Sequence, residues 1–244
     1  QVDQLPLVDA ARHQAVTSSR ASSGRQATAA SPECAQASSI TRRIVEAVAE
    51  RARSGDPVRV LGLTGPPGTG KTTITAELAR ALPEAGIPVA GLAPMDGFHM
   101  SNAVLAARGI ADHKGAPDTF DVGGYVALLG RVRRADGVVL APDYRRDLHE
   151  PVAASLPVEV DGVVITEGNY LGLELPGWAD VRGLIDLLVF IETPFEELAS
   201  RLIDRHVSCG RDRADAAHWV RTVDAANMAL VERTKERANL VLSL

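Results

Sequence analysis

Apolar runs alternate with amphipathic stretches over most of this chain. The apolar runs, bounded by turn residues, have the pattern of buried strands, and the amphipathic stretches repeat apolar residues at the spacing of a helix. In the first such stretch Ile40, Ile44 and Val48 share one helical face, and Gly55 ends it. The expected strands are residues 58–64, 87–95, 138–140, 162–166, 184–191 and 239–242. The expected helices are residues 39–54, 71–82, 101–108, 122–134, 194–206 and 220–234.

Two of these helices begin with N-terminal signals. Asp121 is the expected N-cap of the fourth helix. Thr193 and Glu196 predict a capping box at the fifth, with Pro194 at the first helical position. Strands that alternate with helices form parallel β-α units, and the helices cover both faces of the sheet. We therefore expect an α/β fold with a five-stranded parallel sheet, to which residues 138–140 add a short extra strand.

Residues 1–38 differ in composition from the rest of the chain. They are rich in Ala, Ser, Gln and Thr and show no sustained apolar periodicity. Such a segment buries too little apolar surface to fold, so we expect a disordered tail. An organelle transit peptide would also be rich in Ser and Arg, but it would be poor in the acidic residues that this segment carries. The expected organisation is a tail of residues 1–38 and one domain of residues 39–244.

Composition and charge narrow the classes of partner. The chain has 244 residues, 45% of them hydrophobic, and a formal net charge of −5. That charge offers no general basic surface, which argues against a nucleic-acid partner. No apolar run has the length of a membrane span, which argues against a membrane partner. The two cysteines, Cys34 and Cys209, lie in different segments, so we expect no disulfide and a cytoplasmic location.

The strongest motif is the phosphate-binding pattern G-x-x-x-x-G-K-[ST] at residues 65–72, between an expected strand and an expected helix. A glycine-rich turn at a helix N-terminus directs backbone N–H groups at phosphate oxygens. Lys71 is expected to reach the β- and γ-phosphates, and the Thr72 hydroxyl to ligate Mg²⁺. The chain is therefore expected to bind a nucleoside triphosphate in a three-layer P-loop fold. The expected nucleotide-binding residues are Gly65, Pro66, Pro67, Gly68, Thr69, Gly70, Lys71, Thr72 and Thr73.

Two acidic residues directly follow expected strands. Ligands of open parallel sheets bind beyond the carboxyl ends of the strands, so Asp96 is placed to accept a proton from an attacking hydroxyl. Glu167 follows residues 162–166 in the Walker-B position, where a carboxylate holds Mg²⁺ or its water. The alternatives are an Asp that caps the next segment and an ordinary acid at a strand end.

An arginine-rich segment, residues 201–213, follows the fifth expected helix. Arginine stabilises the charge on a transferring phosphoryl group and can close over a site. The alternative is a solvated helix end, but Gly210 within the segment favours a mobile lid.

Five segments, in this order, resemble the phosphoribulokinase/uridine kinase family, which includes bacterial type I pantothenate kinases. They are Asp-Gly-Phe-His at 96–99, Lys-Gly-Ala-Pro-Asp-Thr-Phe-Asp at 114–121, Pro-Asp-Tyr at 142–144, Val-Ile-Thr-Glu-Gly at 164–168 and Thr-Lys-Glu-Arg-Ala-Asn-Leu at 234–240. The resemblance covers about residues 40–244. Over these residues the chain is similar to the bacterial nucleoside/nucleotide kinases, some of which are labelled fructose-transport kinases. It implies an ATP:alcohol phosphotransferase that uses Mg²⁺ and commonly forms homodimers.

The resemblance also implies roles for individual residues. Asp96 matches the catalytic base, Lys71 the phosphate contact, Thr72 the Mg²⁺ contact and Glu167 the strand-end acid. Arg205 and Arg211 match the lid arginines, and Cys209 stands where uridine kinases tend to have arginine.

The acceptor is expected between Asp96 and the polar, proline-bounded residues 141–152. The expected acceptor-binding residues are His99, Lys114, Tyr144, Arg146, His149 and Tyr170. The alternatives are a solvated hairpin for residues 141–152 and core packing for Tyr170 and Trp178. Trp219 is expected to pack.

Together these features predict a kinase that transfers the γ-phosphoryl group of ATP to a hydroxyl of a nucleoside, a pantothenate-like compound or a sugar. The alternative is a nucleotide-dependent regulatory switch or an ATPase without a small-molecule acceptor. A GTPase is disfavoured because no Asn in the chain is followed by Lys, as its guanine-reading motif requires.

Overall fold

The computed structural model describes residues 32–208 and 210–244. Residues 1–31 of the expected tail, and Cys209, lie outside the described residues. The first helix, α1 (Pro32–Arg53), begins before the expected start at residue 39.

Five parallel strands form the main sheet in the order β2-β5-β1-β6-β7, which confirms the predicted fold class. Their bounds are β1 (Val60–Thr64), β2 (Val89–Leu92), β5 (Val163–Glu167), β6 (Leu187–Glu192) and β7 (Leu240–Ser243). The register pairs Leu63 of β1 with Glu167 of β5 and with Val189 of β6. The carboxyl ends of these three strands therefore meet at one edge of the sheet, where ligands of such sheets bind.

The helices that follow α1 are α2 (Lys71–Glu84), α3 (Asn102–Arg108), α4 (Val122–Arg134), α5 (Trp178–Gly183), α6 (Phe195–Ser208), α7 (Arg213–Trp219) and α8 (Ala225–Glu232). Short 3₁₀ turns are η2 (Met95–Phe98), η3 (Ala111–His113), η4 (Pro117–Thr119) and η6 (Lys235–Arg237), and η5 (Val220–Asp224) is a π-helical turn.

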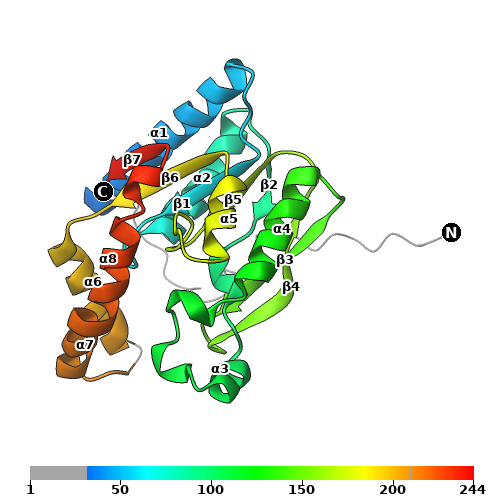
Figure 1. Cartoon of the computed structure of the whole chain (residues 1–244). Coiled ribbons are helices and arrows are strands. Elements are labelled where there is room, and N and C mark those ends of the chain that lie inside the picture. Colours follow the sequence, from blue (N-terminus) through cyan, green and yellow to red (C-terminus); the bar gives the residue numbers. More distant parts are fainter. Residues whose placement is uncertain (1–31, 209) are drawn as a thin grey trace, which may run out of the picture. The chain divides into compact units, whose positions relative to one another are not determined.

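The central strands are buried on both faces. Alternate side chains of a strand point to opposite faces, so Leu61 and Leu63 pack in the apolar cluster of α1 and α2. Val60 of the same strand packs in the second cluster, with residues of α4 and α5. Figure 1 shows α1 and α2 on one side of the sheet and α4 and α5 on the other. The structure therefore has the three layers that the alternation of strands and helices predicted.

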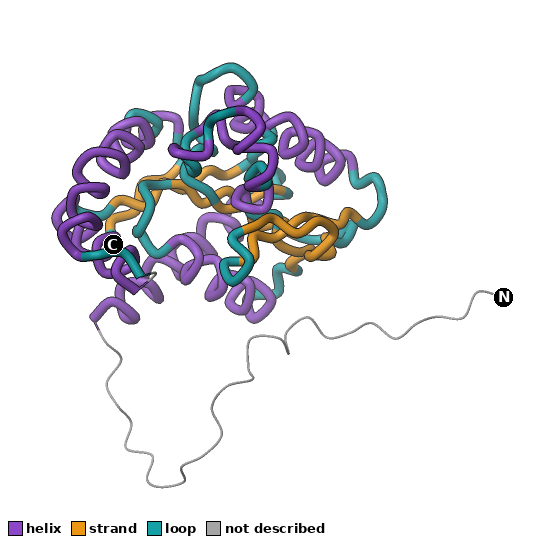
Figure 2. Tube along the Cα trace, turned by 90° about the horizontal axis from the view of Figure 1, so that it is seen from below, coloured by secondary structure: helices purple, strands orange, loops and turns teal. Residues whose placement is uncertain are grey.

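Residues 139–158 form an antiparallel hairpin of β3 (Val139–Arg145) and β4 (Glu150–Val158). Figure 2 shows this hairpin as a separate ribbon beside the main sheet. The sequence predicted a strand only at residues 138–140 and a connection after it. Most of β4 is exposed, and its apolar and polar residues do not alternate as they would in a half-buried strand.

Two further predictions about helices are corrected. The capping box is wrong, because the Thr193 hydroxyl makes no hydrogen bond with any described residue and the first turn of α6 closes on the Pro194 carbonyl. The last helix is not one element over residues 220–234, because a π-helical turn joins α7 to α8. The Asp121 cap is confirmed, since its side chain accepts a hydrogen bond of 2.9 Å from the Gly124 N–H.

Candidate active site

The phosphate-binding loop joins the carboxyl end of β1 to the N-terminus of α2. Gly65 has a φ of +144°, and a Cβ there would lie 2.3 Å from the Ile191 carbonyl oxygen of β6. Only glycine fits so close an approach. The loop is thus held tightly against the neighbouring strand, with the helix N-terminus directed at the space beyond the sheet.

Lys71 folds back over this loop. Its buried Nζ donates hydrogen bonds of 2.9 Å to the carbonyl oxygens of Gly65 and Pro66. The pKa of Lys71 is lowered to about 8, mainly by burial; the charges of Glu167 and Asp96 oppose this shift, and the charge of Arg205 adds to it. The ammonium group is therefore held at the loop by neutral acceptors, with its charge available to a ligand.

Thr72 and Glu167, the two residues expected to hold Mg²⁺, meet across the site. The Thr72 Oγ1 donates a hydrogen bond of 2.9 Å to Glu167 Oε1 at the end of β5. Burial is the main cause that raises the pKa of Glu167, and the charge of Asp96 also raises it. The charges of Lys71 and Arg146 oppose that shift. Among the described residues, no three His, Cys, Asp or Glu side chains gather into a metal site of their own.

Asp96 lies in η2, just beyond β2, and its side chain is 47% exposed. A Cβ at the neighbouring Gly97 would lie 2.3 Å from the Pro142 carbonyl oxygen, so the turn packs directly against β3. The close packing of Gly97 orients Asp96 toward the hairpin side of the site.

His99 packs beside Asp96, with its Nε2 at 4.0 Å from Asp96 Oδ1. Its ring stacks on Phe120 at 4.0 Å between centroids and meets Tyr144 at 5.0 Å. Burial is the main cause that lowers the pKa of His99, the charge of Lys114 adds to it, and Asp96 opposes it. The buried Nδ1 makes no hydrogen bond within the described residues. A neutral imidazole beside a carboxylate can orient that carboxylate or a ligand.

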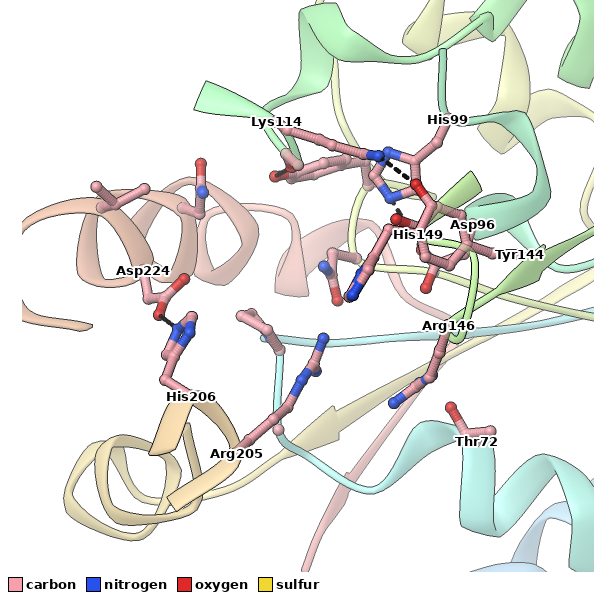
Figure 3. A pocket seen from close by; sticks show the side chains of 18 of the residues that line it. Thr72, Asp96, His99, Lys114, Tyr144, Arg146, His149, Arg205, His206 and Asp224 are labelled. Carbon is pink, nitrogen blue, oxygen red and sulfur yellow. Dashed lines mark hydrogen bonds and ion pairs between the residues drawn. The ribbon is translucent and has the colours of Figure 1, made fainter. Parts of the chain in front are cut away.

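A cavity of about 830 Å³ joins these groups. Figure 3 shows His99, Lys114 and Tyr144 on one side of it and His206 and Asp224 on the other. The sequence-predicted residues that line it are Pro67, Gly68, Gly70, Lys71, Thr72, Asp96, His99, Lys114, Tyr144, Arg146, His149, Glu167, Tyr170, Arg205 and Arg211. Gly65, Pro66, Thr69 and Thr73 do not line it.

One side of this cavity is formed by the tip of the β3–β4 hairpin and by Lys114. Lys114 Nζ donates to the Asn102 side-chain oxygen at 2.6 Å and to the His149 carbonyl oxygen at 2.8 Å. The same ammonium lies 5.3 Å from the ring centroid of Tyr144. Tyr170 is only 1% exposed, and its hydroxyl donates to the Gly115 carbonyl oxygen at 2.7 Å. Tyr170 therefore reaches the cavity from within the aromatic core.

The opposite side belongs to α6, α7 and the π-helical turn. Arg211 lies over the Trp219 ring at 4.2 Å from its centroid, and His206 Nε2 lies 3.0 Å from Asp224 Oδ2. Trp219, expected to pack, thus lines the cavity. The sequence analysis also missed other lining residues, among them Asn169, His206, Asp224 and Asn227. Asn169 could have been found from the sequence, since it follows the Glu167-Gly168 pair at the end of a strand. The other residues come together only through the packing of α6 on α7 and α8.

A second cavity, of about 600 Å³, borders the loop at Pro66. Its lining is mostly apolar and comes from β6, α6, α8 and the end of β7, including Phe195, Met228 and Leu244. The buried Thr193 hydroxyl, which has no hydrogen-bond partner, also lines it. None of the described helices is both long enough and apolar enough to cross a membrane.

Comparisons with known proteins agree with this geometry. A family model described as "AAA domain" matches residues 61–239. YggC of Escherichia coli (strain K12), an uncharacterised protein, is 37% identical over 188 residues, which are 76% of this chain and 77% of YggC. The uridine kinase of Leuconostoc citreum (strain KM20) is 30% identical over 187 residues, which are 75% of this chain and 86% of that enzyme.

Among solved structures, a candidate fructose transport system kinase from Silicibacter sp. TM1040 matches with a TM-score of 0.76 at 33% sequence identity. The match covers 82% of this chain and 98% of that one. The family model extends over the phosphate loop, Asp96, Glu167 and residues 201–213. The chain therefore belongs to the AAA domain family of P-loop proteins and, within it, to the phosphoribulokinase/uridine kinase family of P-loop kinases.

Proposed function

We propose that the protein transfers the γ-phosphoryl group of ATP to a hydroxyl group of a small metabolite. The observation that carries this proposal is that Asp96 opens into the same cavity as Lys71 and the phosphate loop. In direct transfer the acceptor oxygen attacks the γ-phosphorus, so the base and the nucleotide must share one cavity. An ATPase would need only a position for water.

In this proposal Asp96 takes the proton of the acceptor hydroxyl. The hydroxyl oxygen bonds to the γ-phosphorus while the bond between that phosphorus and the ADP oxygen breaks. Lys71, Arg205 and Arg211, which line the cavity, stabilise the negative charge on the transferring group. Positioning and charge stabilisation supply most of the catalysis in phosphoryl transfer.

Thr72 and Glu167 would hold Mg²⁺. Their oxygens are donors that Mg²⁺ prefers, and their 2.9 Å contact brings them to one point beside the loop. Mg²⁺ usually takes one or two protein ligands and completes its shell with water and substrate phosphates, which fits a pair rather than a full cluster. When bound, the ion would neutralise negative charge on the phosphates.

The base of the nucleotide would occupy the second cavity. It adjoins the phosphate loop at Pro66 and is lined by apolar side chains, which suit the faces of a heterocycle. The buried Thr193 hydroxyl would provide a hydrogen bond to the ring edge.

The acceptor would lie against the hairpin side of the main cavity, where His99, Lys114, Tyr144, Arg146 and His149 line it. The relatives are named for uridine and for fructose transport, so nucleosides and sugars are acceptors to test, together with pantothenate. A homodimer and a cytoplasmic location stay predictions from the sequence.

The test is ADP release from Mg-ATP with uridine, cytidine, pantothenate, ribulose 5-phosphate and fructose, in the wild type and in Asp96→Asn. We expect acceptor-dependent turnover that falls by about a hundredfold to ten-thousandfold in the variant, as for the loss of a general base. Asp118→Asn is the matched control, because Asp118 bonds to His113 and does not line the cavity. Turnover that needs no acceptor and survives Asp96→Asn would contradict the proposal and favour an ATPase.

A further inference from the structure

Arg145 and Arg146 are neighbours at the tip of the β3–β4 hairpin, but their side chains have different surroundings. Arg145 donates to both carboxylate oxygens of Asp147, at 2.9 and 2.7 Å. Arg146 lines the main cavity and makes no hydrogen bond or ion pair with any described residue. The fold therefore brings the charge of Arg146 to the cavity without giving it a partner.

The side chain of Arg146 is directed at the phosphate side of the cavity. Figure 3 shows its guanidinium pointing toward Thr72 and Arg205, and away from Lys114. Thr72 donates to Glu167 at 2.9 Å beside the phosphate loop. Burial raises the pKa of Glu167, and the charge of Arg146 is one of those that oppose this shift. The direction of the side chain and the reach of its charge agree that Arg146 faces the pair formed by Thr72 and Glu167.

Arg205 approaches the same region from the opposite wall. It belongs to α6, and Figure 3 shows its guanidinium pointing into the cavity from the side that faces the hairpin. Burial lowers the pKa of Lys71, and the charge of Arg205 adds to that lowering. The other lid arginine, Arg211, lies over the Trp219 ring at 4.2 Å from its centroid. Arg205 is thus the lid arginine whose charge reaches the phosphate loop.

These charges suit one multiply charged ligand. Among the described residues, no carboxylate pairs with Arg146 or Arg205, and like charges that point into one cavity repel each other. A phosphoryl group between them would compensate both, because a guanidinium donates parallel hydrogen bonds to phosphate oxygens. The charge of a transferring phosphoryl group is spread over its three equatorial oxygens, which can accept from more donors than Lys71 and one arginine provide.

The sequence analysis expected Arg146 to bind the acceptor. We propose instead that Arg146 is a catalytic residue that contacts the γ-phosphoryl group from the hairpin side, while Arg205 contacts it from the lid side. The N–H groups of Arg146 donate to the non-bridging oxygens and give up no proton, so the bonds that form and break are those of the transfer itself. This inference rests on the proposed kinase function and makes the hairpin supply charge stabilisation to the transfer.

The first test separates kcat from KM. Arg146→Gln removes the charge at an exposed position, where substitutions rarely unfold a protein. For each acceptor that turns over, we expect kcat to fall by about tenfold to hundredfold, the range for a lost hydrogen bond between charged groups, and the KM of the acceptor to change by less than about threefold. Arg146→Lys should recover part of kcat, because it restores the charge without the planar fork.

Arg145→Gln is the matched control and should behave as the wild type, since Arg145 bonds to Asp147 outside the cavity lining. A higher KM of the acceptor with an unchanged kcat in Arg146→Gln would place Arg146 on the acceptor and overturn the inference. The kinase proposal would then still stand, because it depends on acceptor-dependent turnover and on Asp96.

A binding measurement needs no turnover. Aluminium fluoride, added with ADP and Mg²⁺, takes the position of the transferring phosphoryl group, so calorimetry of ADP with and without it measures the binding of that group. The wild type and Arg145→Gln should bind ADP at least about a hundredfold more tightly with aluminium fluoride, as for a transition-state analogue. Arg146→Gln should lose about tenfold to hundredfold of this gain and bind ADP alone as the wild type does.

The outcomes of this measurement distinguish the two proposals. The same loss in Arg146→Gln, in a protein that turns over no acceptor, would support the role of Arg146 and contradict the kinase proposal. A gain that survives Arg146→Gln, or that is absent from the wild type, would overturn the inference.

Discussion

The walls of the main cavity are built in two opposite ways. On the phosphate-loop wall, Lys71 is buried and hydrogen-bonded to loop carbonyl oxygens. On the hairpin and lid walls, Arg146 and Arg205 are exposed, and neither forms an ion pair with a described residue. The loop wall has its positive charge in place before any ligand arrives.

This difference separates charged groups that the fold already holds in place from charged groups that a ligand has to order. Groups that the fold already orients cost no reorganisation when charge develops in the transition state. Exposed arginines on a hairpin tip and a lid must be ordered by the ligand, which links their contribution to the presence of the correct substrate. We therefore expect substitutions on the loop wall to affect every reaction of the nucleotide, and those on the other walls to depend on the acceptor.

The largest effect should come from the loop wall. Lys71→Met removes the buried ammonium that lies beside the phosphate site, and we expect kcat to fall by about a hundredfold to a thousandfold, as when one preorganised donor is lost. Steady-state kinetics with any acceptor that turns over measures this change. Arg134→Met is the control, because Arg134 forms an exposed pair with Asp136 at 2.9 Å, and such pairs contribute little. A loss of activity with one acceptor but not with others would contradict the expectation that the loop wall serves every reaction of the nucleotide.

A smaller effect is expected from the lid. Arg205→Gln should lower kcat by about tenfold to hundredfold, because one charge-assisted hydrogen bond to the transferring group is lost. Binding of ADP, measured by calorimetry, should change much less. Arg213→Gln is the matched control, since Arg213 pairs with Asp204 on the exposed side of the lid at 3.1 Å. If Arg205→Gln and Arg213→Gln lower kcat equally, the loss comes from a less stable α6–α7 segment and not from the missing contact of Arg205.

The smallest effect concerns the pH dependence of stability. Burial lowers the pKa of His99 below its ordinary value of 6.5, so the unfolded chain binds more protons than the folded protein as the pH falls below that value. Stability therefore declines from about pH 6.5 downward through the folded pKa. His99→Gln should make this decline shallower, as measured by urea midpoints over a pH series. The groups that face His99 are Asp96, Lys114, Phe120 and Tyr144.

The control for this measurement is His218→Gln, which changes an exposed histidine of α7. It should leave the slope as in the wild type. An unchanged slope in His99→Gln would show that His99 titrates as an exposed group.

Much of the fold could be predicted because its central strands are buried on both faces. Leu61, Leu63 and Val164 belong to continuous apolar runs, and the loop between β1 and α2 has a motif of its own. The hairpin was only an alternative interpretation of residues 141–152, because Val152, Ala153 and Ala154 are exposed in β4 and do not alternate with polar residues as in a half-buried strand. The capping box at Thr193 failed because a matching motif does not show at which residue a helix begins.

The sequence by itself determined the nucleotide half of this protein. A phosphate-loop motif at residues 65–72 and two strand-end acids are local patterns, and local patterns can be read because their geometry follows from the elements on either side. Only the tertiary structure decided how the side chains on the hairpin side and on the opposite side of the cavity are arranged. The contact of Lys114 with the hairpin tip, the separation of Arg146 from Arg145 and the position of Trp219 on the cavity depend on packing between distant segments. Sequence spacing carries no record of such contacts, because they arise from the way β3, β4, α6 and α7 pack around the sheet.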